Sequence, residues 1–138
     1  MNVVGEVLTA YYSLINGQTA LGTYKLTVPI DVTTNYVWLY PESGVEINTK
    51  SSKNDRLVIR VDIVTFFEND ADQTACETAD TIINELIIPT PGENGLTAPS
   101  GLQFLNVERE NYQYLIERSG TGVVYRKISR YTQRVHQL

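Results

Sequence analysis

An alternating pattern, with an aliphatic residue at every second position from 57 to 63 and charged residues among the positions between them, runs through the stretch RLVIRVDIVTFF at 56–67. Its apolar positions are Leu57, Ile59, Val61 and Ile63. Its charged positions, on the opposite side, are Arg56, Arg60 and Asp62. Because successive side chains of an extended strand point to opposite faces, the pattern predicts a strand with one buried face. The charged face then contacts water, a ligand or another copy of the chain.

The size of the chain favours one domain, residues 1–138, with a single core. The hydrophobic fraction of 42% and the charged fraction of 20% suggest neither disorder nor a fibrous repeat. No apolar run approaches the ~20 residues that cross a membrane, and the first residues, MNVVGEVLTAYY, lack the pattern of a secretory signal. We therefore expect no membrane partner. The single cysteine, Cys76, cannot form an internal disulfide, so we expect folding inside a cell.

The net charge of -5 conceals a division of charge along the chain. Between Asp62 and Glu108 there are acidic residues and no Lys or Arg. The part after Arg118 has no acidic residue, and its basic residues are Arg126, Lys127, Arg130 and Arg134. Because the net charge of the whole chain is negative, nucleic-acid binding is a weak explanation of the basic part. Contact between the acidic part of one copy and the basic part of the next is at least as good, with Arg126 and Arg130 as interface candidates.

Periodicity and turn residues divide the chain into helices and strands. The predicted elements, in chain order, are a helix at 3–15, strands at 36–40 and 56–67, a helix that starts near Asp70, and strands at 102–118 and 122–135. Asp70 and Gln73 have the spacing of a capping box. The segment 16–35 is expected to be a loop with at most an edge strand, and loops at about 43–55 and 89–101 are expected to project.

This order of elements predicts an α+β fold. An antiparallel sheet of about four main strands, with two helices packed on one face, buries every apolar stripe found in the sequence. The other face of the sheet is only half apolar. Its charged residues Arg60 and Asp62 are therefore predicted to face a neighbouring subunit or a wet cavity.

No set of residues suggests a catalytic, metal or cofactor site. The one histidine, His136, lies close to the C-terminus, where chains often fray, and a catalytic triad would have to use it. Cys76 lies on the inner stripe of the second helix, where an inert buried thiol is the better interpretation. The glycine-rich SGTGV at 119–123 precedes strand residues and lacks the Lys-Ser/Thr pair of a phosphate loop, which favours a hairpin turn.

The acidic residues of the second helix are a weak candidate for a metal site. They are Asp72, Glu77, Asp80 and Glu85, and their spacing scatters them around the helix. The nine tyrosines concentrate in the predicted strands and the first helix, where aromatic rings fill cores and subunit contacts alike. An enzyme would need distant carboxylates such as Asp62 and Glu108 to converge in a cleft. We therefore expect a protein without catalytic activity and without a cofactor.

Four pieces of the sequence follow one another in a recognisable order. They are VVGEVLTAYYSLI at 3–15, YVWLYPESGVEINTKSSKNDRLVIRVDIVTFF at 36–67, ADQTACETADTIINELI at 71–87 and VVYRKISRYTQRV at 123–135. Together they resemble the tail terminator, or tail completion, proteins of long-tailed bacteriophages and related prophage elements. The resemblance lies in element order and pattern and covers most of the chain, whereas the segment 16–35 has no match in the family.

The resemblance implies a structural subunit of a virion. Family members form a ring, usually a hexamer, that caps the tail tube where the head-completion (neck) proteins attach, and they have no catalytic residues to carry over. In this chain the loops with Lys50, Lys53 and Glu93 would contact tube or neck. The charged strand faces would contact the next subunit or line a channel through which DNA can pass without being read in sequence. The protein would assemble in the host cytoplasm and reside in the tail-neck region of the virion.

Two alternatives stay open at this point. A head-tail connector or head-closure ring component would share the assembly logic and differ in its partner. A small non-enzymatic ligand-binding α+β domain would be a monomer or dimer with a definable apolar pocket.

Overall fold

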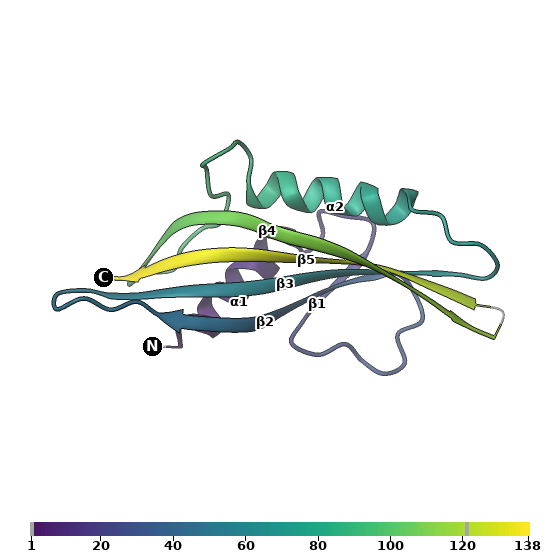
Figure 1. Cartoon of the computed structure of the whole chain (residues 1–138), viewed down its shortest axis with the longest axis horizontal. Coiled ribbons are helices and arrows are strands. Elements are labelled where there is room, and N and C mark those ends of the chain that lie inside the picture. The colour runs from purple at the N-terminus through teal and green to yellow at the C-terminus, as the bar shows by residue number, and fades with distance from the viewer. Residues whose placement is uncertain (1, 121) are drawn as a thin grey trace.

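Five strands form one mixed sheet in the computed structural model, which describes residues 2–120 and 122–138 (Figure 1). The strands are β1 (Gly22–Lys25), β2 (Tyr36–Glu46), β3 (Lys53–Phe67), β4 (Leu102–Ser119) and β5 (Gly122–Gln137). Their order across the sheet is β1-β2-β3-β5-β4. β1 and β2 are parallel, and the other neighbouring pairs are antiparallel. The turn predicted at 119–123 joins β4 and β5, and its Thr121 lies outside the described residues.

The predicted antiparallel sheet of about four strands is therefore wrong, both in the number of strands and in the direction of one pair. The additional strand, β1, is the edge strand that the sequence allowed within 16–35, and it has a single buried side chain, that of Thr23. So short a strand has no alternation for a sequence pattern to reveal. After β1, residues 26–35 return the chain to the same end of the sheet, so β2 runs parallel to β1. Trp38 Nε1 donates a hydrogen bond to the carbonyl of Leu26 at 2.9 Å, which stabilises the start of the segment 26–35.

β2 is longer than predicted because Pro41 lies at an edge of the sheet. β1 pairs only with residues 36–39, so from Pro41 onward β2 has a strand neighbour on one side only. Proline, which lacks an amide hydrogen, is tolerated on such an edge. The pairing shifts register between Pro41 and Ser43 and then continues. The connection expected over 43–55 therefore narrows to a turn at 47–52.

Both helices, α1 (Val3–Ile15) and α2 (Thr74–Ile87), pack on the same face of the sheet. α2 begins later than predicted, and the capping box of Asp70 and Gln73 does not form, because the Gln73 side chain makes no capping hydrogen bond. Asp72 takes that role and accepts hydrogen bonds from the amide and the hydroxyl of Thr74, at 2.9 and 2.8 Å. Neither helix, within the part of the chain that is described, is long and apolar enough to cross a membrane.

The core lies between the helices and the predicted inner face of β3. On that face Leu57, Ile59, Val61 and Ile63 are all at most 3% exposed, which confirms the alternation. The helices contribute Val7, Leu8, Tyr11 and Ile15 from α1, and Cys76, Ala79, Ile83 and Ile87 from α2. Each large aliphatic side chain buried here contributes about 1.5–3 kcal/mol. Cys76 is fully buried, and burial raises the pKa of its thiol to about 12.

The sheet has two distinct ends (Figure 1). Lys53, at the start of β3, and Leu102, at the start of β4, both lie level with Gln137 at the end of β5. The turn 47–52 and the connection 88–101 therefore flank the same end, which we call the loop end. The β4–β5 turn lies at the other end, the arm end.

Candidate functional site: the helix-free sheet face and the arm strand

The face of the sheet opposite the helices, which we call the helix-free face, is rich in arginine. Its arginines are Arg56, Arg60, Arg126, Arg130 and Arg134, on β3 and β5. Arg60 lies directly opposite Arg130. Like charges in that position destabilise a sheet unless other groups offset them. Two carboxylates, of Asp62 and Glu42, offset them here.

Asp62 is buried in the middle of this face, at 2% exposure. Tyr40 Oη donates a hydrogen bond to its Oδ2 at 3.2 Å, and Arg60 Nη2 lies 3.6 Å from the same oxygen. The other oxygen, Oδ1, has no hydrogen-bond partner among the described residues. Burial raises the pKa of Asp62 more than the nearby Arg60 lowers it. Burial, together with the Asp62 carboxylate, raises the pKa of Tyr40 to about 12. Arg60 and Asp62 thus lie on one face, as their alternation predicts, and contact each other, but Asp62 lies below the surface.

Arg130 joins three strands of the helix-free face. Its Nε donates to Glu42 on β2 at 2.7 Å, and its Nη1 donates to Asn111 on β4 at 3.2 Å. Arg126 is half-buried, and its Nε, like that of Arg60, has no partner within the described part of the chain. Buried donors without partners are uncommon in native structures and call for an explanation. They make this face a candidate contact surface.

The other predicted interface residues lie at the loop end. Lys50 lies in the β2–β3 turn, Lys53 begins β3 and Glu93 lies in the α2–β4 connection, and all three are exposed. They are separate from Arg126 and Arg130, which lie within β5 on the helix-free face. The predicted interface residues therefore form two groups rather than one continuous patch.

A buried charge network lies under α2, and it is not among the sites predicted from the sequence. Lys127, whose side chain is 4% exposed, donates to Asp80 and Glu77, both at 2.9 Å. Arg109 pairs with the second oxygen of Asp80 and donates to the Ser129 hydroxyl at 2.6 Å. The acidic and basic parts of the chain, which were expected to meet between copies, thus meet within one copy.

The sequence did contain a signal for this network. Asp80 lies on the buried stripe of α2 with Cys76 and Ile83, at helical spacings of four and three residues. Lys127 alternates in phase with the buried Tyr125 of β5, so it points toward the helices. Asp80 is therefore directed inward and is not scattered to the outside of α2. Its partner, Lys127, is indicated by the alternation of β5, a strand that is distant from α2 in sequence.

Tyrosines of β4 cover the network. The ring centre of Tyr112 lies 4.6 Å from Lys127 Nζ and 4.8 Å from the guanidinium carbon of Arg109. Tyr114 Oη donates to Glu77 at 2.7 Å. Burial alone lowers the pKa of Lys127, but hydrogen bonds to its carboxylate partners outweigh burial and raise it. The lysine is held charged, and the network fastens β4 and β5 to α2.

Residues 110–118 of β4, which we call the arm strand, are all exposed. β4 is an edge strand of the sheet, so these residues have a strand neighbour on one side only. Four large apolar side chains lie among them, Tyr112, Tyr114, Leu115 and Ile116, and they are 42% to 61% exposed. Exposed apolar surface of this kind often marks a contact with another protein. The arm strand is the second candidate contact surface.

The structure brings no catalytic set together from the candidates named in the sequence. His136 lies within β5 with its Nδ1 2.9 Å from Asn54 Oδ1, so it is held in the sheet and not frayed. Asp62 and Glu108 lie opposite Ile128 and Thr132 of β5, so about 13 Å of strand separates them. Among the described residues, no three or more His, Cys, Asp or Glu side chains are placed to hold a metal ion.

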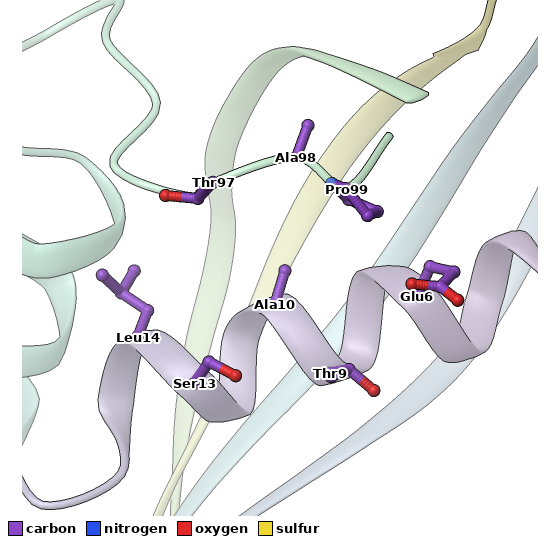
Figure 2. Close-up of a pocket in the computed structure, with 8 residues that line it drawn as sticks. All are labelled: Glu6, Thr9, Ala10, Ser13, Leu14, Thr97, Ala98 and Pro99. Atoms are coloured by element: carbon purple, nitrogen blue, oxygen red, sulfur yellow. The ribbon is translucent and has the colours of Figure 1, made fainter. Parts of the chain in front are cut away.

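A groove of about 390 Å³ lies between α1 and the segment 97–99 (Figure 2). Its lining residues are Glu6, Thr9, Ala10, Ser13, Leu14, Thr97, Ala98 and Pro99. Most of these side chains are small, and one carboxylate is present. Small-molecule sites are usually lined by large apolar groups with a few convergent polar ones. The groove therefore gives little support to the ligand-binding alternative.

Comparison with known proteins gives a fold but no family. No protein-family model matches the chain, and no curated protein matches its sequence. One chain of a solved structure, "Virion of native gene transfer agent (GTA) particle", matches with a TM-score of 0.70 at 13% sequence identity. The match covers 97% of this chain and 99% of that chain. This protein therefore has the fold of a chain of that particle over nearly its full length.

Proposed function

We propose that the protein is a structural virion component, a tail terminator whose copies form a hexameric ring on the end of a tail tube and join it to the head-completion proteins. The observation that carries the proposal is the match to a chain of the GTA virion, which spans 97% of this chain and 99% of that one. A match so complete concerns the whole subunit and not a shared fragment. The element order that resembles tail terminators supports the finer assignment.

The surfaces of the subunit suit a ring placed between two other assemblies. A ring subunit has two neighbours of its own kind and, in a cap, a partner on each side of the ring. The loop end, with Lys50, Lys53 and Glu93, is assigned to the tail tube or the neck protein. The arginines of the helix-free face are assigned to a neighbouring subunit or to the channel wall, where DNA would present phosphates and no sequence.

The proposed role needs no catalysis and no cofactor. The buried charges that could otherwise indicate an active site are those of Lys127, Asp80 and Arg109. Lys127 and Arg109 each take one oxygen of Asp80, so this carboxylate is already paired inside the chain. Such a network holds elements in place and leaves little room for a substrate group.

The first test is the mass of the purified protein in solution. Light scattering over a concentration series, in low and moderate salt, is expected to show a discrete ring-sized oligomer that gains population with concentration. Electron microscopy of the same samples should show rings. A monomer at all concentrations would contradict ring formation by the protein alone and would favour the ligand-binding alternative.

The second test separates the terminator from a connector. In particles produced without this chain, tails should be of uncontrolled length and unattached to heads, because nothing ends the tube or joins it to the neck. Tails of normal length beside heads that lack a closed exit would instead indicate a connector or head-closure ring. If particles produced without this chain are complete and can still infect cells or transfer DNA, the proposed role in the virion is wrong.

A further inference from the structure

The arm strand has the properties of an edge that is covered in the assembled protein. Its central part, NYQYLI at 111–116, contains no charged residue and no proline. The pairing of β4 with β5 is shifted between Phe104 and Val107 and between Arg109 and Asn111, but from Asn111 to Ser119 it is regular. Monomeric proteins usually protect such an edge with lysine, proline or a bulge, because bare edges pair with other chains. This one has no such protection over residues 111–116.

The other edge of the same sheet is β1, and it lies level with the arm strand. Cross-strand register connects one residue of every strand in a single row: Tyr24, Trp38, Asp62, Ile128 and Gln113. Tyr24 is on the first edge and Gln113 is on the last edge. A second copy of the chain placed beside the first, without displacement along the strands, therefore brings β1 of one copy next to the arm strand of the other.

The directions of the two edge strands also agree with such a contact. β1 is parallel to β2, and the three following pairs across the sheet are antiparallel, so β1 and β4 run in opposite directions. β1 of one copy and β4 of its neighbour would thus form an antiparallel pair, the arrangement that is slightly more stable per residue. Both helices of each copy would remain on the same side of the joined sheet.

We propose that neighbouring copies join edge to edge, with the arm strand of one copy pairing antiparallel with β1 of the next. The contact uses two different edges, so it is heterologous and closes into a ring where the rotation between copies permits. It rests on the self-association in the proposed function and specifies its surface. The helix-free faces then form one continuous wall, and the buried network under α2 positions the arm strand for pairing.

Paired cysteine substitutions test this register. Tyr24→Cys and Gln113→Cys in one chain place thiols on the same row of the helix-free face, one at each edge. Mild oxidation with diamide should link successive copies and give a ladder of covalent multimers on a non-reducing gel, ending at the ring. The native Cys76 is fully buried and its thiol pKa is raised to about 12, so it stays silent. Tyr24→Cys with Gln103→Cys, at the loop end of β4, is the matched control and should give no ladder.

The single variants sharpen the result. A mixture of Tyr24→Cys protein with Gln113→Cys protein should stop at dimers, because each copy then carries one thiol. Dimers from Gln113→Cys protein alone would show that two arm strands pair with each other, and would overturn the proposal. The absence of a ladder from the double variant, in samples where light scattering shows oligomers, would overturn it as well and leave the ring itself intact.

A charge at the edge gives an independent test. Ile116 is 61% exposed, so Ile116→Lys should leave the monomer folded, which circular dichroism checks, and should weaken self-association at least about tenfold. Ile47→Lys makes the same change at the loop end, at a residue 45% exposed, and should leave self-association unchanged. Equal effects of the two variants would overturn the edge contact. The tails of particles produced without this chain test the proposed function independently of this edge contact.

Discussion

Neighbouring basic residues of β5 have opposite roles on the two faces of the sheet. Lys127 points toward the helices and is paired with two carboxylates of α2. Arg126, the preceding residue, points to the helix-free face, where its Nε has no partner within the described residues. The difference shows that a basic run in sequence is not one surface in a strand. One half of it holds the fold together, and the other half is available to partners.

The carboxylates on the two faces differ in the same way. On the helix side, Glu77 is partly exposed, and its hydrogen bonds to Lys127 and Tyr114 outweigh burial, so its pKa is lowered. On the helix-free face, Asp62 is buried beside one arginine, and burial dominates, so its pKa is raised. The paired carboxylate of Glu77 stabilises the folded chain, whereas the incompletely paired carboxylate of Asp62 destabilises it.

The largest effect is expected from breaking the buried network. Lys127→Met keeps the length of the side chain and removes its charge, which leaves one oxygen of Glu77 and one oxygen of Asp80 without their lysine partner. The free energy of unfolding should fall by about 3 kcal/mol, as for other broken buried ion pairs. Urea denaturation followed by circular dichroism measures the change.

The matched control is the same substitution at the preceding residue. Arg126→Met should change the free energy of unfolding by less than about 1 kcal/mol, because Arg126 Nε has no hydrogen-bond partner among the described residues and its charge adds only a minor attraction to Asp62. Equal losses for Lys127→Met and Arg126→Met would refute the contrast between the two faces.

The sequence predicts well wherever a long pattern meets a single buried face. The alternation from Leu57 to Ile63 and the helix at 3–15 are reproduced in the structure, because many residues carry the same signal. The sequence allowed an edge strand within 16–35, but the exact place and the parallel direction of β1 could not be predicted, since they depend on pairing with β2 and on the return of residues 26–35. The extension of β2 past Pro41 depends on how far β1 reaches, which is likewise a tertiary fact.

In the candidate site too, local patterns predict some features, and tertiary contacts decide the others. Arg60 and Asp62 were found by alternation, and alternation places them on one face. The burial of Asp62 could not be predicted, because Tyr40 reaches it from another strand. The exposure of residues 110–118 is a tertiary property of the fold, whereas the apolar character of NYQYLI at 111–116 in sequence suggests a buried strand.

A smaller effect, of opposite sign, is expected from removing the charge of Asp62. Its raised pKa means that the folded protein binds its proton more tightly than the unfolded chain does. Stability is therefore lost as pH rises from about 4 through the raised pKa, and it stays lower above that range. Asp62→Asn should flatten this decline and raise the free energy of unfolding at pH 7 by about 1 kcal/mol. Urea midpoints from pH 3 to pH 8 test it, and an unchanged slope would contradict a raised pKa.

The smallest effect is expected from Glu77, where the sign reverses. Its lowered pKa means that the unfolded chain binds the proton more tightly, so the ionised carboxylate contributes stability that is fully present above about pH 4.5 and is lost as pH falls through the lowered pKa. The side chain is 36% exposed, so solvent screens the pair with Lys127, and Glu77→Gln should cost only about 0.5 kcal/mol at pH 7.

Measured in the same pH series, Glu77→Gln should lose stability relative to the unmodified chain at neutral pH and match it in acid. Asp62→Asn should gain at neutral pH and converge in acid. If both variants shift the curve in the same direction, the two faces do not differ in the way that their ion pairs indicate.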